Sequence, residues 1–163
     1  MMNFSKQSLV DNGFRGFLTV KDLWKDKSMI PRKMGVYMVL NIESNVEFIN
    51  PGVGGFFKGK DPNVDFPQLK EKYVDSSVIY IGKAGGISSG ATLFSRISQY
   101  LKFGQTKNVG HYGGRYIWQL KNHHNLLFCW KKLSEEEPIM LEKELLSNFK
   151  AEYGKLPFAN LVG

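Results

Sequence analysis

The chain alternates between short apolar runs and longer mixed stretches, and the apolar runs predict the strands. Residues 34–40 (MGVYMVL) form an apolar run with a composition typical of strands, and Pro31 precedes it. Residues 78–81 and 125–133 are two further runs of this kind. We therefore expect three strands, the second of which ends at the glycine-rich segment that begins with Gly82.

Two later segments carry apolar residues at helical spacing. A helix is expected over residues 91–103, because its inward positions fall on one face at about 100° per residue. These inward positions are Leu93, Arg96, Ile97 and Tyr100. The last helix is expected to have Pro138 in its first turn, with Ser134 and Glu137 at the spacing of a capping box, and to end before Gly154. Strands and helices together predict a small mixed α/β domain.

Each expected helix carries a charged residue next to its apolar positions. The ordinary explanation for Arg96 is a long side chain that extends to solvent. Glu142 is in register with Leu145 and Phe149, whereas Glu144 is rotated by about 200° and should face solvent. A carboxylate on the inner side of a helix is costly unless it binds a cation or a hydrogen-bond donor. A buried ion pair with Arg96 is therefore the alternative to a functional role.

The remaining stretches differ from these elements in composition. Residues 41–76 hold several glycines and prolines among scattered charges and predict a long insertion, which is usually functional or partly ordered. We expect residues 1–34 to be an N-terminal extension packed on a core domain of residues 35–163, in a single globular unit. Its apolar positions look packed, and they are Phe14, Phe17, Leu18, Val20, Leu23 and Trp24.

Composition and charge narrow the classes of function. A chain of 163 residues suits one domain and needs no disulfide to fold. Twenty-two Lys and Arg against 15 Asp and Glu give a net charge of +7, which suits a polyanionic partner, either nucleic acid or an anionic membrane surface. No stretch is long enough to cross a bilayer, and the N-terminus lacks a signal-peptide pattern. Cys129 is the single cysteine, so we expect no intrachain disulfide, no cysteine-based zinc site and a cytoplasmic location.

Several features that resemble functional motifs are weak when taken alone. The segments 51–60 (PGVGGFFKGK) and 82–90 (GKAGGISSG) combine glycines with lysine, but neither fits a phosphate-binding loop. His123 and His124 in NHHN resemble a fragment of an HNH nuclease without its other residues, and His111 stands apart from them. We expect all three to be surface or structural histidines. Cys129 lies in an apolar strand and is expected to be a buried, inert thiol.

Five elements occur together in a specific order. Gly35-Val36-Tyr37 lies on the first expected strand, and Tyr80-Ile81-Gly82 lies on the second, followed by Lys83-Ala84. A helical arginine, a glutamate early in the last helix and an asparagine near the end come after them: Arg96 (LFSRISQY), Glu142 (MLEKELL) and Asn160 (LPFAN). This series resembles the GIY-YIG nuclease family, in patches from Gly35 to Asn160. In that family the two tripeptides usually lie on strands joined by a short hairpin, whereas Tyr37 and Tyr80 are 43 positions apart here.

The resemblance implies a fold and a set of roles. The fold would be α/β of the α+β type, with a small central antiparallel three-stranded sheet flanked by helices and a long insertion between the first two strands. Glu142 would hold a Mg²⁺ (or Mn²⁺) ion as its single protein carboxylate, and Arg96 would pair with the scissile phosphate. Tyr37 would take the proton of the attacking water, and positive charge from Lys83 or a metal-held water network would lower its pKa. Tyr80 would orient the water or the phosphate, or replace Tyr37 as the base.

Two further residues complete the catalytic set. Tyr100 occupies a position where the family often has a second polar active-site group, and Asn160 would brace the site through hydrogen bonds. Without Arg96 and Glu142, the simpler explanation for Tyr37 and Tyr80 would be ordinary strand aromatics with tethered hydroxyl groups.

The resulting expectation is a metal-dependent endonuclease that hydrolyses phosphodiester bonds, with DNA as the partner rather than RNA, no membrane, and a monomeric or homodimeric state. A nucleic-acid-binding module that has kept the fold but not the activity is the first alternative. A small-molecule phosphate-binding enzyme that uses the glycine loops is the second.

Target recognition would have to come from regions outside the motifs. Residues 104–125 mix basic and aromatic side chains, which suit phosphate contact and base stacking as well as a plain amphipathic surface. With Arg96, the expected nucleic-acid-binding residues are Lys107, Arg115, Tyr116, Trp118 and Lys121, with Tyr112 beside them.

Overall fold

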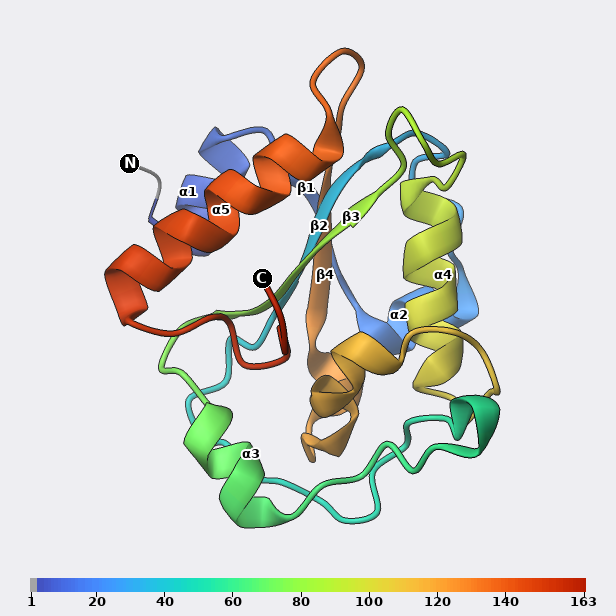
Figure 1. Ribbon diagram of the computed structural model, residues 1–163, viewed down its shortest axis with the longest axis vertical. Helices are drawn as coiled ribbons and strands as arrows, with labels where there is room; N and C mark the ends of the chain where they lie inside the picture. The colour runs from blue at the N-terminus through green and yellow to red at the C-terminus, as the bar shows by residue number, and fades with distance from the viewer. Residues whose placement is uncertain (1–2) are drawn as a thin grey trace.

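The computed structural model, which describes residues 3–163, is built around a four-stranded antiparallel sheet (Figure 1). Its strands lie in the order β1-β4-β2-β3, so β1 and β3 are the edges. The strands are β1 (Arg15–Thr19), β2 (Gly35–Leu40), β3 (Val78–Ala84) and β4 (Leu127–Lys132). Met1 and Met2, which begin the expected N-terminal extension, lie outside the described residues.

The sheet confirms an α+β architecture with three strands where the apolar runs predicted them, but the expected count of three strands is wrong. The fourth strand, β1, pairs antiparallel with β4 and comes from the region expected to be only an extension. Gly16 and Phe17 both have positive φ angles, and the pairing register shifts between Gly16 and Leu18. This bulge breaks the two-residue alternation by which a strand is recognised in a sequence.

Helices cover both faces of the sheet (Figure 1). α1 (Lys6–Asp11) and α5 (Pro138–Tyr153) pack on one face, and α2 (Val20–Lys25) and α4 (Leu93–Phe103) pack on the other, with two 3₁₀ helices, η2 (Tyr112–Gln119) and η3 (His123–Asn125). Because both faces are covered, all six residues of β2 are buried. None of the helices within residues 3–163 is long and apolar enough to span a membrane.

The insertion between β2 and β3 crosses one end of the sheet without disturbing the pairing of those strands. It contains η1 (Phe57–Gly59) and α3 (Phe66–Lys72). The backbone N–H of Asn41 donates to the carbonyl of Ser77 (2.7 Å), which closes the insertion where it leaves the sheet. The buried Gln119 side chain fixes the middle of the insertion, because it donates to the carbonyls of Ile49 (3.1 Å) and Val64 (3.0 Å). The insertion is therefore ordered by contacts with η2.

The last helix begins as expected at Pro138, but the predicted capping box of Ser134 and Glu137 is not formed. Glu137 is itself the residue before the helix, and no side chain caps the helix end. A Glu137 carboxylate oxygen instead accepts from the backbone N–H of Ile87 (3.2 Å). The carboxylate thus serves a tertiary contact, which links the start of α5 to the loop that follows β3.

Candidate active site

A pocket of about 350 Å³ opens beside edge strand β3, between α4 and the start of α5. Five of the seven expected catalytic residues line it, from four elements: Tyr37, Tyr80, Lys83, Arg96 and Glu142. The other lining residues are Gly85, Ser89 and Ala91 of the loop after β3. The fold thus brings together side chains that are more than 100 positions apart in the chain.

Strand register places the two tyrosines on the same face of the sheet. Tyr37 lies opposite Gly82, and Tyr80 lies opposite Val39, so both rings project toward α4. Their ring centroids are 6.0 Å apart. A Cβ atom at Gly82 would come within 2.7 Å of Cζ of Tyr37, so a glycine is needed for the phenol to lie across β3. The glycine of this tripeptide therefore has a packing role in the site.

The two tyrosines differ in their exposure. Tyr37 is 1% exposed, and its hydroxyl is hydrogen-bonded to Nε2 of His111 (2.9 Å). Burial raises the pKa of Tyr37 well above its ordinary value, and the charge of Tyr80 adds to this. Tyr80 is partly exposed, and burial also raises its pKa, while the neighbouring Tyr37 acts in the opposite direction. Both tyrosines line the pocket, and Tyr80 is the more exposed of the two.

Arg96 and Glu142 face the pocket as separate charges. The alternative of an ion pair between them is wrong, because the one ion pair within 4.0 Å in residues 3–163 joins Lys121 and Glu47. Arg96 instead donates to the side-chain oxygen of Gln99 (2.8 Å). Burial raises the pKa of half-buried Glu142, while Lys83 and Lys143 act against that shift.

The carboxylate of Glu142 fits a hard divalent cation. It is half-buried, it has no ion-pair partner among the described residues, and an open pocket lies beside it. No group of three or more His, Cys, Asp or Glu side chains that could hold a metal occurs in the part of the chain that the structure describes. Mg²⁺ commonly takes one or two protein carboxylates and completes its shell with waters and phosphate oxygens, so one carboxylate is sufficient. Glu142 is the residue that would hold the ion.

Tyr100 and Asn160 stand behind the pocket and do not line it. The fully buried Tyr100 donates its hydroxyl proton to the carbonyl of Gly114 (2.5 Å), and its ring lies edge-on to Tyr80. The buried Asn160 side chain accepts from the N–H of Ile81 (2.9 Å) and donates to its carbonyl (2.8 Å). It therefore pairs with the free edge of β3 as a neighbouring strand would, and both residues act on the site by bracing it.

His111 is a site residue that the sequence did not reveal. It precedes η2, is 4% exposed and reaches Tyr37 on β2 from 74 positions away. Its local sequence, glycine and tyrosine on either side, carries no catalytic pattern. His123 bonds to the carbonyl of Leu120 and His124 is exposed, which confirms structural and surface roles for these two. Cys129 is fully buried and its thiol pKa is raised by burial, as expected for an inert cysteine.

Two of the aromatic residues expected to contact nucleic acid in the 104–125 segment are buried. Trp118 is 0% exposed and lies against Trp24, and Tyr116 is 3% exposed and accepts from the side chain of Gln68. Both aromatic rings belong to the core because η2 packs its apolar face onto α2 and α4. In their present positions, neither ring can stack on a base.

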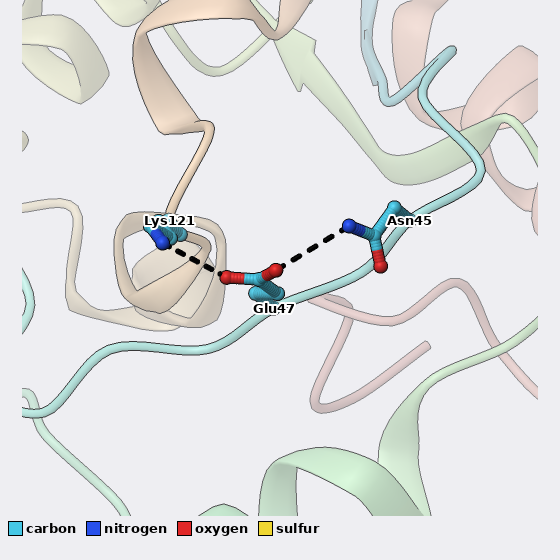
Figure 2. A network of polar contacts seen from close by, with 3 residues as sticks. All are labelled: Asn45, Glu47 and Lys121. Atoms are coloured by element: carbon cyan, nitrogen blue, oxygen red, sulfur yellow. Dashed lines mark hydrogen bonds and ion pairs between the residues drawn. The ribbon is translucent and has the colours of Figure 1, made fainter.

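The basic residues of the same segment have different surroundings. Lys121 pairs with Glu47 (3.0 Å), which also accepts from Asn45, as Figure 2 shows. The guanidinium carbon of Arg115 lies 3.9 Å from the centroid of the Tyr112 ring. The same guanidinium donates to the backbone carbonyl of Tyr112 (3.1 Å). Only Lys107 of the three expected basic residues is exposed without such a contact within residues 3–163.

A second groove continues from the pocket along α4. It has a volume of about 610 Å³ and shares Ala91 and Arg96 with the pocket. Besides Arg96, its lining includes the basic side chains Arg32 and Lys102 and no acidic residue of the described chain. The guanidinium of Arg32 lies 3.8 Å from the ring of Phe94. No pattern in the sequence groups Arg32 with α4, because Arg32 precedes β2.

Comparison of the chain with protein families, with curated proteins and with solved structures found no match.

Proposed function

We propose that the protein is a metal-dependent endonuclease that hydrolyses phosphodiester bonds in DNA. The observation that carries this proposal is the convergence of Tyr37, Tyr80, Lys83, Arg96 and Glu142 on one pocket. Hydrolysis of a phosphodiester needs an activated water, in-line attack and stabilisation of charge on the phosphoryl oxygens. These side chains provide two positively charged groups, one carboxylate and two hydroxyl groups within a single cavity.

The chain's own residues divide the work by their surroundings. Arg96, held by Gln99, presents a planar guanidinium that would bind two non-bridging oxygens of the scissile phosphate. Tyr80 would orient the attacking water and, as the phenolate, take its proton, because Tyr80 is partly exposed whereas Tyr37 is buried. Lys83 would offset the negative charge that gathers at the phosphate and at Glu142.

Glu142 would hold a Mg²⁺ or Mn²⁺ ion that, when bound, acts as a Lewis acid on the phosphoryl oxygens. Burial of the carboxylate supports this assignment, since a cation nearby would offset the cost of its partly desolvated charge. The chain then supplies one carboxylate, and substrate and water oxygens supply the remaining contacts.

The groove along α4 is the proposed path of the DNA backbone. Arg32 and Lys102 extend from Arg96 along one surface without an intervening acid, which suits a row of phosphates. Phe94 adds a partly exposed ring beneath Arg32, which would keep the guanidinium in place.

The direct test is incubation of purified protein with supercoiled plasmid and with long genomic DNA, with Mg²⁺ or with a chelator. We expect cleavage that needs the divalent cation. Glu142→Ala should abolish it, and Glu144→Ala is the matched control, because Glu144 lies on the same helix with the same charge but is exposed. Equal cleavage by the two variants would contradict the site assignment.

The groove has its own test in the binding of a DNA duplex at several salt concentrations. Arg32→Ala and Lys102→Ala should each weaken binding and reduce the salt-dependence slope by about one. Lys121→Ala is the control of equal charge, since Lys121 is already paired with Glu47. If Lys121→Ala weakens binding as much as the other two, the backbone path is wrong.

A nucleic-acid-binding module without activity is the second candidate. The raised pKa values of Tyr37 and Tyr80 favour it, since both hydroxyls are poor bases in the free protein. Steep salt-dependent binding with no cleavage under any divalent cation would support this candidate over the nuclease.

A further inference from the structure

His111 is hydrogen-bonded to Tyr37, one of the tyrosines that line the pocket. The expected set of catalytic residues gives His111 no role. Its Nε2 lies 2.9 Å from the Tyr37 hydroxyl, within hydrogen-bonding distance, and both side chains are buried. The contact joins β2 to the segment before η2. It lies in the core on the side of the sheet that carries the pocket.

The ring of His111 is clamped in one orientation. It stacks on the ring of Tyr100 with the centroids 3.7 Å apart and the planes within 4° of parallel. Tyr100 is in turn fixed by its hydrogen bond to the carbonyl of Gly114 (2.5 Å). The backbone N–H of His111 donates to the carbonyl of Val109 (3.1 Å), which anchors the main chain. The imidazole therefore meets Tyr37 through Nε2 only.

The surroundings of the ring keep it neutral. Burial lowers the pKa of His111 to about 3, and the positive charge of Arg96 contributes to this. The other side chains that face the ring are the phenols of Tyr37, Tyr80 and Tyr100. A neutral imidazole carries one N–H, so Nε2 and Nδ1 cannot both be donors.

One observation decides which nitrogen carries the proton. The Nδ1 atom is buried and has no hydrogen-bond partner among the described residues, and a buried N–H without a partner is rarer in proteins than an unpaired acceptor. The proton therefore lies on Nε2, and Nε2 donates to the Tyr37 hydroxyl oxygen, its partner at 2.9 Å. The hydroxyl proton of Tyr37 then cannot lie between the two groups and is directed away from His111.

We propose that His111 is a positioning residue whose Nε2–H donates to the Tyr37 hydroxyl oxygen and thereby directs the Tyr37 proton away from His111 and toward the pocket that Tyr37 lines. This inference rests on the proposed function only for its effect on cleavage. Tyr37 is then a hydrogen-bond donor at the pocket, and it is not the base that the sequence suggested.

The role can be separated from DNA binding. His111 lies behind Tyr37 and lines neither the pocket nor the groove along α4. Its removal should therefore reduce kcat and leave KM for DNA unchanged, because the phosphate contacts are intact while the direction of one proton is lost.

The first experiment determines the tautomer in the unmodified protein and does not need activity. In histidine-¹⁵N-labelled protein, long-range ¹H–¹⁵N spectra assign which ring nitrogen carries the proton, and the His111 signals are identified by their loss in a variant. We expect the Nε2–H tautomer at neutral pH. An Nδ1–H tautomer or a charged ring would overturn the inference, even if the protein proves to be an active nuclease.

The second experiment compares two replacements. His111→Phe keeps an aromatic ring on Tyr100 but has no donor, and His111→Gln keeps an N–H donor near the position of Nε2. We expect kcat to fall by at least about tenfold in His111→Phe with KM unchanged, and His111→Gln to recover most of this loss. Equal kcat in His111→Phe and the unmodified protein, or an equal loss in both variants, would contradict the role. If His111→Phe does not fold, the tautomer decides the question, and if the protein does not cleave DNA, the proposed function fails while the tautomer is still measured.

Discussion

Both faces of the sheet are buried in a core, but the side chains on the two faces differ in polarity. On the face covered by α1 and α5, the side chains are almost entirely apolar, with Met38, Cys129 and Phe149 at the centre. The face covered by α4 and η2 buries a larger core and also places polar groups in it, among them those of Tyr37, Tyr100 and His111.

The difference lies in what each face requires of its neighbours. Apolar side chains need only to fill space, whereas a buried hydroxyl or imidazole needs a partner at a set distance and direction. On the polar face, Tyr100 has its partner in Gly114 and Tyr37 has its partner in His111. We infer that the apolar face mainly stabilises the fold and that the polar face mainly holds the geometry of the pocket.

Truncation of a side chain on the apolar face should destabilise the fold without changing the cleavage rate of the folded molecules. Phe149 is fully buried and contacts Phe4 and Tyr153, so Phe149→Ala should lower the free energy of unfolding by about 3–5 kcal/mol. Urea unfolding measures this loss, and Phe149→Leu should cost much less. Cleavage per folded molecule should be unchanged, and a selective loss of cleavage in Phe149→Ala would contradict the division between the faces.

Removal of one hydroxyl from the polar face should instead reduce cleavage and leave the stability of the fold almost unchanged. Tyr80→Phe should reduce the cleavage rate by about 100-fold, because the partly exposed phenol is the proposed contact to the attacking water. The free energy of unfolding should change by less than about 1 kcal/mol. Tyr153→Phe on α5 serves as the control, since Tyr153 does not line the pocket.

Acid should destabilise the polar face through His111. Its pKa is about 3 in the folded protein, whereas an unfolded histidine binds a proton below about 6.5. The unfolded state therefore takes up a proton that the folded state does not, and stability is lost as the pH falls from about 6.5 to about 3. The contribution is at most about 1.4 kcal/mol per pH unit. Urea unfolding at several pH values should give a smaller slope for His111→Gln, and identical slopes would argue against a neutral buried ring.

The smallest effect is expected at the exposed ion pair, which belongs to neither face. Lys121 and Glu47 keep 67% and 50% of their side-chain surface in solvent (Figure 2). Such pairs are screened and contribute little. Glu47→Ala should leave the urea midpoint and the cleavage rate unchanged. A clear loss of either would mean that this surface does more than hold one screened ion pair.

Much of the fold could be predicted because its main elements have strong local patterns. The runs around Tyr37, Tyr80 and Cys129 form β2, β3 and β4, and two helices lie where the spacing placed them. β1 escapes prediction because its bulge at Gly16 removes the alternation. The Ser134 capping box is wrong because Glu137 has a tertiary partner in Ile87 that local sequence cannot reveal.

The residues of the candidate site also include some that the sequence could predict and some that it could not. The five pocket residues could be predicted because the series of motifs that carries them resembles a known nuclease family, and Glu142 also stands out as an acid on the inner face of a helix. The aromatic residues of η2 have the same composition as a base-stacking surface, and only their burial separates the two possibilities. His111 and Arg32 have no motif at all, and they join the site and its groove through contacts with distant segments.

By itself, the sequence determined the strands β2, β3 and β4 and the two long helices, because periodicity is a local property of the chain. The side chains that meet at β3 could be expected only because the series of motifs resembles a known family. Only the tertiary structure decided how those side chains are used. It buried Tyr37 at the wall of the pocket and left Tyr80 partly exposed there, kept Arg96 and Glu142 apart, and brought His111 to Tyr37. Burial and hydrogen-bond direction arise from which segments pack together, and no single stretch of sequence contains that information.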